Sequence, residues 1–425
     1  MKVLVVGSGG REHAIVRALI RTWSGAGELN VLCAPGNPGI AKDARCFPDV
    51  GGEDVDALTA LAEHEGVDLV AVGQEVPLVD GLVDQLRAKG IKAFGPSKAA
   101  AQLEGSKIFC KEVLVASGVP TAGYAVLTSR EEAEAAADRA SYPVVFKSDG
   151  LAAGKGVIIC ATREEATAAI DEYFTEQRFG ETDVIIEEYL DGVEVSLLAI
   201  CDGESAHSLV PARDYKRIFD GDAGPNTGGM GAFSPVPEVA AGQIAEISAQ
   251  VHQPIVDEMK RRGADFHGVL YAGLMLTADG VKVLEYNVRF GDPETQALLP
   301  RLTSDLAQLM LASAEPGGLA GSEIEFSPDR SVTITLASAG YPESSSKGDV
   351  ISGLDDIDPG IEVTHAGTAF GPDGTTIVTA GGRVLNVTAV SDSVPHARAA
   401  AYAAANIIDF DGKQQRSDIG AGIEL

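Results

Sequence analysis

The first hundred residues alternate short apolar, β-branched runs with segments of helical periodicity. The runs predict strands at 3–6, 31–33 and 68–72, with helices between them at 57–65 and 79–88. Strands that alternate with helices are typical of a parallel α/β sheet. Glycine- and proline-rich loops follow the strands, at 7–10, 35–39 and 73–77. Since open α/β sheets bind ligands at the carboxyl ends of their strands, the pattern predicts a binding crevice here.

The pattern changes after the turn at 117–120. Two capping boxes, Thr128 with Glu131 and Thr162 with Glu165, predict helix starts, and apolar runs predict strands at 144–147, 157–160 and 184–187. These segments form a small α+β unit that resembles a lid. Further strands are predicted at 193–200, 269–276 and 281–288, then a helix at 302–314 and a linker at 314–318 before a β-rich segment.

We therefore expect a multidomain protein of the α/β and α+β classes. The predicted parts are an N-terminal parallel α/β substrate domain at 1–102, a central domain at 103–325 with its lid at about 120–190, and a C-terminal β-rich domain at 326–425.

Composition restricts the partners and the compartment. The 33 basic and 62 acidic residues give a net charge of −29, which opposes binding to nucleic acid or to an anionic membrane. The five cysteines are isolated from one another, as in proteins of a reducing cytosol. The chain shows neither a signal-peptide apolar region near Met1 nor 18 consecutive apolar residues. We expect a cytoplasmic protein with no nucleic-acid or membrane partner.

Two glycine loops are candidate phosphate sites. The loop at 7–10 joins a strand to a helix, so its N–H groups could hold a phosphate, although a structural turn is the alternative. It is not a dinucleotide fingerprint, because Glu12 stands where the third glycine is required. The loop at 147–156 joins two strands and carries two lysines that could close over a triphosphate; an ordinary hairpin is the alternative. Gly156 replaces the Ser or Thr of a Walker A loop.

A polar stripe suggests a metal site. Glu285, Asn287 and Arg289 alternate with apolar residues, so in a strand they share one face. Glu and Asn oxygens suit Mg²⁺ bound to a nucleotide, and the arginine could stabilise a transferring phosphoryl group. The solvated face of a strand is the alternative, but the polar turn at 290–295 favours function. The loops at 214–217 and 224–231 suggest phosphate contact and loop closure. Three histidines without metal-ligand spacing are expected to be structural or surface residues: His207, His252 and His365.

Together these features resemble the ATP-grasp superfamily and, within it, the phosphoribosylamine-glycine ligases, also called glycinamide ribonucleotide synthetases. The resemblance runs the whole chain and rests on the strings at 9–14, 34–37, 103–107, 149–156, 224–231, 289–296, 365–368 and 418–420. It implies an ATP-grasp fold with a pre-ATP-grasp N-terminal domain. It also implies ligation of glycine to 5-phospho-β-D-ribosylamine through glycyl phosphate, in purine biosynthesis, with ATP as co-substrate, Mg²⁺ or Mn²⁺ as the metal, and a monomer, or alternatively a dimer.

The resemblance also implies site residues, by position. Catalytic roles fall to Arg289, Lys147 and Asp292, and the metal ligands are Glu285 and Asn287. The implied ATP contacts are Lys107, Lys147, Lys155, Glu187, Tyr189, Leu190, Glu194 and Lys216. The implied substrate contacts are Gly9, Gly10, Asn37, Glu75, Asp214, Asn226, Asp292 and Pro293.

Four positions depart from the family pattern: Gln74, Ser148 and Tyr215 replace Pro, Ala and His, and Gly273 stands where many ATP-grasp enzymes place a metal carboxylate. We therefore expect fewer protein ligands around the metal. The alternatives are another ATP-grasp carboxylate-amine ligase or carboxylase acting on a purine intermediate, a nucleotide-binding protein without turnover, and a nicotinamide-dependent dehydrogenase.

Overall fold

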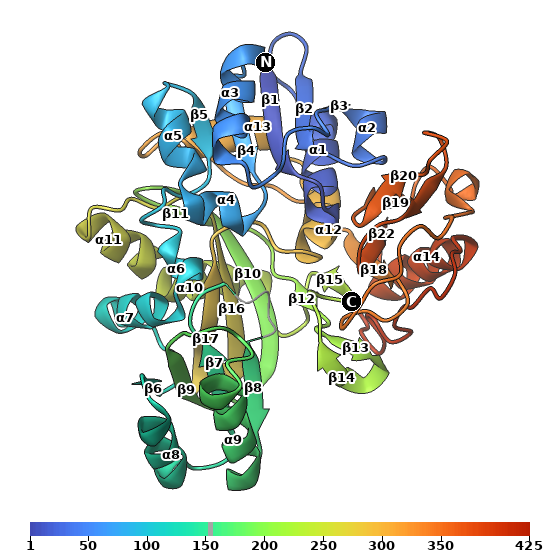
Figure 1. The fold of residues 1–425 in the computed structure, drawn as a ribbon. Helices are drawn as coiled ribbons and strands as arrows, with labels where there is room; N and C mark the ends of the chain where they lie inside the picture. The colour runs from blue at the N-terminus through green and yellow to red at the C-terminus, as the bar shows by residue number, and fades with distance from the viewer. Residues whose placement is uncertain (152–155) are drawn as a thin grey trace.

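The computed structural model describes residues 1–151 and 156–425 (Figure 1). Its N-terminal part is a five-stranded parallel sheet in the order β3-β2-β1-β4-β5. Its elements are β1 (Lys2–Gly7), α1 (Gly10–Thr22), β2 (Asn30–Pro35), α2 (Ile40–Asp43), β3 (Arg45–Cys46), α3 (Val55–Glu65), β4 (Leu69–Val72), α4 (Glu75–Asp80), α5 (Leu82–Ala88) and β5 (Lys92–Phe94).

The continuous apolar run of β1 is explained by burial on both faces. Leu4 packs in the same cluster as Leu58 of α3, whereas Val3 packs with Ile15 of α1. Strands covered by helices on both sides lack the alternation of half-exposed strands. The helix predicted at 79–88 is wrong in one respect: Gly81, at φ +97°, separates α4 from α5.

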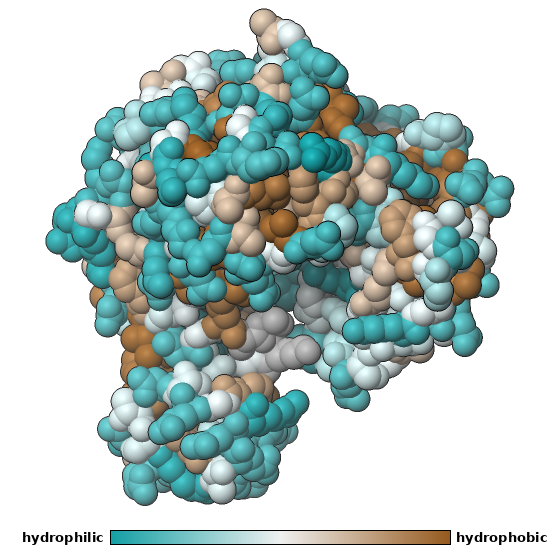
Figure 2. Space-filling view, turned by 45° about the horizontal axis from the view of Figure 1, so that its top comes forward, coloured by the Kyte–Doolittle hydropathy of each residue, from teal (hydrophilic) through white to brown (hydrophobic). Residues whose placement is uncertain are grey.

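The lid is a four-stranded antiparallel sheet in the order β6-β9-β7-β8, with its own apolar core. Two helices, α6 (Gln102–Gly105) and α7 (Lys107–Ser117), precede it. Its elements are β6 (Tyr124–Leu127), α8 (Arg130–Arg139), β7 (Val144–Ser148), β8 (Val157–Cys160), α9 (Arg163–Ile170) and β9 (Val184–Glu188). Figure 2 shows the lid standing out from the body as a lobe with a mostly hydrophilic surface.

Of the two predicted helix caps, one is shifted by a residue in the structure and the other is confirmed. The cap of α8 lies one residue later than predicted, because Ser129 accepts from the Glu132 N–H while the Glu132 carboxylate accepts from the Thr128 N–H. The cap of α9 is Thr162, as predicted, and it accepts from the Glu165 N–H.

The central antiparallel sheet has the order β11-β10-β16-β17. Its elements and the helices around it are β10 (Val193–Asp202), β11 (Ala206–Ser208), α10 (Ala241–Val251), α11 (Gln253–Arg261), β16 (His267–Thr277), β17 (Gly280–Asn287), α12 (Glu294–Leu298) and α13 (Leu306–Ser313). The helix predicted at 302–314 is shorter, because Asp305 caps α13 by accepting from the Gln308 N–H.

The C-terminal layer is a five-stranded sheet in the order β12-β15-β18-β22-β19. Its strands are β12 (Arg213–Asp214), β15 (Gly231–Ser234), β18 (Arg330–Ala337), β19 (Glu362–His365) and β22 (Arg383–Ser391), and α14 (Val394–Ile407) packs on β18 and β22. The hairpins β13 (Arg217–Phe219) with β14 (Ala223–Asn226) and β20 (Thr368–Phe370) with β21 (Ile377–Thr379) lie outside it. Two of its five strands, β12 and β15, thus come from the chain before residue 326, where the C-terminal domain is predicted to begin. No helix in the described ranges combines the length and apolar character needed to cross a membrane.

Candidate functional site

Strand register creates the site by placing polar residues on one face of the central sheet. Across β10, β16 and β17, Ser196 pairs with Gly273 and Gly273 with Glu285, while Tyr271 pairs with Asn287. Directly paired residues project from the same side of a sheet. Glu285 and Asn287 therefore share a face with Ser196 and Tyr271, and Gly273 leaves space between them.

Basic side chains surround Glu285. Burial raises the pKa of this carboxyl, but the charges of Lys216, Lys147 and Lys107 outweigh it and hold the pKa below its usual value. Arg289 also lowers the pKa of Glu285. It lies just beyond the end of β17 rather than within the strand. Four cations thus act on this carboxylate, and cations gathered in this way suit a polyphosphate.

A buried ion network supports Lys147. Glu187 is 3% exposed, and its Oε2 lies 2.9 Å from Lys147 Nζ while its Oε1 lies 3.1 Å from Lys111 Nζ. Lys111 also donates to Thr121 Oγ1 at 2.7 Å. Glu187 thus holds the two lysines together, and sequence reasoning missed Lys111. The available signal was its position four residues after Lys107, on the same face of α7.

Arg289 connects the central sheet to the N-terminal part of the chain. Its Nη2 lies 2.7 Å from Glu104 Oε1, and its Nε lies 3.3 Å from Glu75 Oε2. Glu104 also accepts from the Val288 N–H at 2.8 Å. Burial raises the pKa of Glu104, whereas Arg289 and Arg11 lower that of Glu75 against its burial. Sequence reasoning assigned no role to Glu104, because a single carboxylate in the short helix α6 has no distinctive pattern.

The glycine loop at 7–10 differs from the expectation of free N–H groups. The Gly9 N–H donates to Glu12 Oε2 at 2.6 Å. A Cβ at Gly7, Gly9 or Gly73 would lie 2.6, 2.7 and 2.3 Å from the nearest Glu12 atom. Arg11 Nε, 2.6 Å from Glu12 Oε1, balances the buried charge. The Gly9 N–H is therefore occupied by Glu12, which holds the loops after β1 and β4 together.

The turn after β17 meets the glycine loop and the C-terminal layer. A Cβ on Gly9 would lie 3.7 Å from Asp292 Oδ2, and one on Gly229 would lie 2.3 Å from Pro293. Arg383 Nη2 lies 3.3 Å from Asp292 Oδ2, and its Nη1 donates at 2.6 Å both to the Asp292 carbonyl and to the Gly228 carbonyl. Sequence reasoning missed Arg383, because only the fold brings β22 to this turn.

The side-chain amide of Asn37 is hydrogen-bonded to backbone groups of the protein. Its Nδ2 donates to the carbonyls of Ser8 and His365, each at 2.8 Å, and its Oδ1 accepts from the N–H groups of Gly39 and Ile40. The side chain therefore positions loops rather than presenting a free amide. The histidine expectations agree with the structure for His365 and His252, which are buried.

The remaining predicted residues are distributed over several other elements. Glu194 pairs with Lys216 at 2.8 Å, Leu190 is buried, and Tyr189 is 42% exposed. Asn226 ends β14, and Asp214 lies on β12. The Tyr215 hydroxyl accepts from the Gly420 N–H at 3.0 Å and its ring stacks under Arg416, so this replacement for His packs in the structure. Lys155 lies outside the described residues.

The donor set fits a divalent cation that is also bound by phosphates. Glu285 and Asn287 offer oxygen atoms on one face, and hard cations prefer oxygen ligands. Within residues 1–151 and 156–425, no group of three or more His, Cys, Asp or Glu side chains could hold a metal ion.

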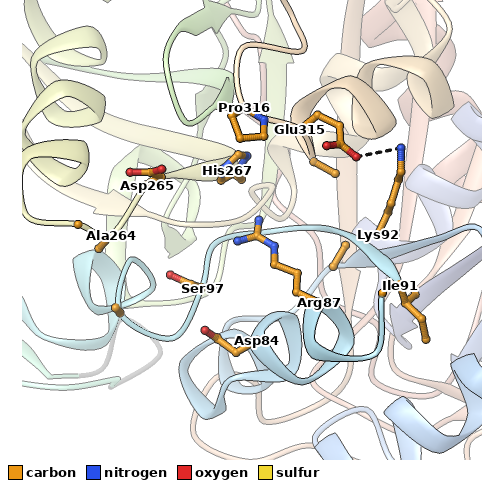
Figure 3. Close-up of a pocket in the computed structure, with 15 residues that line it drawn as sticks. Asp84, Arg87, Ile91, Lys92, Ser97, Ala264, Asp265, His267, Glu315 and Pro316 are labelled. Carbon is orange, nitrogen blue, oxygen red and sulfur yellow. Dashed lines mark ion pairs between the residues drawn. The ribbon is translucent and has the colours of Figure 1, made fainter.

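A separate surface pocket of about 670 Å³ lies between the N-terminal and central parts of the chain. Figure 3 shows Arg87 pointing into it, near Asp84, with the ion pair of Lys92 and Glu315 at one side. None of the predicted site residues that the structure describes lines it.

The sequence matches one protein family over most of its length. Models described as phosphoribosylglycinamide synthetase match residues 1–104 (N domain), 105–295 (ATP-grasp (A) domain) and 331–422 (C domain). A protein of Streptomyces coelicolor named phosphoribosylamine-glycine ligase is 48% identical over 430 residues, covering 99% of each chain. A Brucella melitensis protein of the same name is 46% identical over 426 residues, covering 99% of this chain and 97% of that protein.

Solved structures support the same family assignment. The crystal structure of phosphoribosylamine-glycine ligase from Thermotoga maritima superposes with a TM-score of 0.85 at 33% identity, covering 99% of this chain and 100% of that chain. A biotin carboxylase from Campylobacter jejuni, at 16% identity and a TM-score of 0.71, covers 99% and 94% and shares the fold alone.

Proposed function

Because the chain belongs to the phosphoribosylglycinamide synthetase family, we propose how its own residues carry out that family's reaction. The enzyme is an ATP-grasp ligase that joins glycine to 5-phospho-β-D-ribosylamine, giving glycinamide ribonucleotide, ADP and phosphate in purine biosynthesis. The observation that supports the residue roles is the polar face of the central sheet: Glu285 and Asn287 share it, and the charges of Lys107, Lys147, Lys216 and Arg289 act on Glu285.

The chemistry requires two displacements. A glycine carboxylate oxygen attacks the γ-phosphorus of ATP, the bond to ADP breaks, and glycyl phosphate forms. The amine of phosphoribosylamine then attacks the glycyl carbonyl carbon, phosphate leaves, and the amine proton is lost. Phosphoryl transfer depends on positioning and charge neutralisation, and the acyl phosphate must be protected from water.

We assign these tasks to the basic residues. Lys107 and Lys147 bind the ATP phosphates, and Lys155 is proposed as a further contact. Arg289 contacts the transferring phosphoryl group and the acyl oxygens, and its pairing with Glu75 and Glu104 fixes its guanidinium at the junction of two domains. A preorganised cation costs no reorganisation during the reaction.

Glu285 and Asn287 would hold the divalent cation, which we propose to be Mg²⁺ or Mn²⁺. When bound, the cation neutralises charge on the ATP phosphates. Gly273 leaves the paired position on β16 without a carboxylate, so we assign the remaining coordination to phosphate and water.

The other proposed contacts divide between the nucleotide and the second substrate. We assign contacts with the adenosine to Tyr189, Leu190, Glu194 and Lys216, whereas Glu187 acts by holding Lys147. The phosphoribosylamine side comprises Gly9, Gly10, Glu75, Asn226, Asp292 and Pro293, with Asp214 a further substrate contact and with Asn37 and Arg383 positioning the loops. We also propose domains at 1–102, 103–325 and 326–425, and a monomer, with a dimer as the alternative, that acts in the cytoplasm.

The test is ADP formation from Mg-ATP and glycine, with and without freshly generated phosphoribosylamine, with the product identified by mass spectrometry. ADP and glycinamide ribonucleotide that appear only with all three substrates would support the assignment. Bicarbonate-dependent ADP release would instead indicate a carboxylase, and an absence of ADP with every substrate present would refute the proposed activity.

A further inference from the structure

The fold brings together two cysteines that are apart in the sequence, Cys33 on β2 and Cys46 on β3. The two residues are direct partners in the parallel pairing of these strands. Both side chains belong to the same apolar cluster, so they lie on the same side of the sheet. Neighbouring strands lie about 4.8 Å apart, within the range of about 4.4–6.8 Å that a disulfide spans between Cα atoms. The backbone therefore places the two thiols within reach of a disulfide.

The surroundings of the pair leave room for the two sulfur atoms to approach. A Cβ on Gly36 would lie 3.0 Å from the Cβ of Cys46 and 3.7 Å from the Cβ of Cys33. Gly36 has a φ of +74°, where glycine is favoured, so this position adds no side chain beside either cysteine. Strand β3 has two residues and forms the edge of the sheet, so it can shift toward β2 with little loss of pairing.

The two thiols differ in exposure. Cys33 is fully buried, whereas Cys46 is half-buried. Burial raises the pKa of both thiols, and the nearby Cys46 raises that of Cys33 further. Both groups are therefore protonated at neutral pH, which keeps them from reacting with weak oxidants. An oxidant that arrives from solvent meets Cys46 first, and Cys33 lies in position to react with the oxidised sulfur.

We propose that Cys33 and Cys46 are a modification site: a peroxide oxidises them to a reversible disulfide, which weakens the binding of phosphoribosylamine. The Cys46 thiolate attacks one oxygen of hydrogen peroxide, the O–O bond breaks, hydroxide leaves, and Cys46 becomes a sulfenic acid. The Cys33 thiolate then attacks the Cys46 sulfur, the S–O bond breaks, and the S–S bond forms as a second hydroxide leaves. The two thiol protons convert these hydroxides to water, so two thiols and one peroxide give one disulfide and two waters. A dithiol reductant reverses the change.

The effect on substrate binding follows from the contact between this pair and the glycine loop at 7–10. Cys33 Sγ donates to the Gly7 carbonyl at 3.3 Å, and the Gly36 N–H donates to the same carbonyl at 3.2 Å. A disulfide removes the thiol hydrogen and with it the first of these hydrogen bonds. Gly9 and Gly10, which we propose as phosphoribosylamine contacts, directly follow in this loop. The effect on binding therefore rests on the proposed function, whereas formation of the disulfide does not.

The test reads the chemistry and the kinetics separately. The full chain is treated with hydrogen peroxide, the peroxide is removed, and the free thiols are alkylated before tryptic digestion. Cleavage after Lys42 and Arg45 places the two cysteines on different peptides, so a disulfide appears in the mass spectrum as a linked pair. Dithiothreitol should release the two peptides from each other.

The kinetic expectation is specific to one substrate. In the oxidised enzyme the KM for phosphoribosylamine should rise about 3- to 10-fold, the loss of one hydrogen bond, while the KM for ATP stays within about twofold. Dithiothreitol should restore the original value.

Cysteine variants supply the controls. Cys46→Ser should form no linked peptide and should keep its KM for phosphoribosylamine after peroxide. Cys160→Ala, in the lid, where Cys160 pairs with Val144, is the matched control and should respond to peroxide as the wild type does. If Cys46→Ser does not fold, judged by its melting transition, Cys33→Ala makes the same test.

Three results would overturn the inference. The first is that both cysteines remain open to alkylation after peroxide, and the second is that Cys46 becomes a sulfinic acid while Cys33 stays free. The third is an equal rise in the KM for phosphoribosylamine in Cys46→Ser and in the wild type, or a linked pair with no rise. A reduced wild-type enzyme that forms no ADP with all three substrates would refute the proposed function, and the linked peptides would still decide whether the disulfide forms.

Discussion

Replacing Glu187 by Gln tests whether the lid is held by a buried charge. Glu187 lies 2.9 Å from Lys147 Nζ and 3.1 Å from Lys111 Nζ, and both lysines are buried. Burial, together with the charge of Lys147, lowers the pKa of Lys111, and Glu187 opposes that shift. Removal of the shared carboxylate leaves two buried cations facing each other. Breaking a buried ion pair from one side costs about 3–5 kcal/mol.

The size of the effect can be expressed as a melting temperature. The matched ATP-grasp region covers residues 105–295. For a domain of this size 1 kcal/mol corresponds to about 2–4 °C, so a loss of about 3 kcal/mol lowers the melting temperature by roughly 6–12 °C. Lys147 also loses its support, so the KM for ATP should rise about tenfold.

The adjacent residue provides the control. Glu188 pairs with Lys282 at 2.9 Å, but its side chain is 49% exposed, and an exposed pair contributes at most about 1 kcal/mol. Calorimetry and steady-state kinetics on Glu187→Gln and Glu188→Gln should therefore diverge. Equal melting temperatures for the two variants would refute the electrostatic account of the lid.

Three further substitutions follow from the structure. Glu285→Ala should lower kcat by about 100-fold or more, because it removes the carboxylate that we propose as a metal ligand, and near-normal turnover at saturating magnesium would contradict that role. Burial lowers the pKa of His252 from 6.5 to about 4, so below pH 6.5 the unfolded chain binds a proton that the folded chain does not. Stability should then fall as the pH drops from about 6.5 to about 4, and His252→Gln should remove about 3 kcal/mol of that fall in a pH series of melting curves; an unchanged slope would show that His252 is not the group responsible. Arg383→Lys should raise the KM for phosphoribosylamine about tenfold while the KM for ATP stays within twofold, because a single ammonium cannot hold both Asp292 and the Gly228 carbonyl. Equal effects on both KM values would contradict a role confined to the substrate turn.

Local patterns in the sequence determined most of the elements, including the strand that carries Glu285 and Asn287. Strand β1 is a continuous apolar run in the sequence because it is buried on both faces. In β17, Glu285 and Asn287 alternate with apolar residues, as the sequence predicted. The cap of α9 at Thr162 was also predictable, since capping depends on residues within one turn. The break at Gly81 was missed because glycine is compatible with a helix interior and only its φ of +97° ends α4.

Tertiary structure alone decided how the charges are paired. Arg289 meets Glu104 and Glu75 across 185 and 214 positions of sequence, and Arg383 meets Asp292 across 91. The amino-acid sequence alone does not indicate which distant carboxylate pairs with which cation. The pairing is decided by how the N-terminal, central and C-terminal sheets pack together. For the same reason the sequence showed Glu12 as a departure from a glycine fingerprint. Only the fold shows that its carboxylate fills the space beside Gly7, Gly9 and Gly73 and takes up the Gly9 N–H.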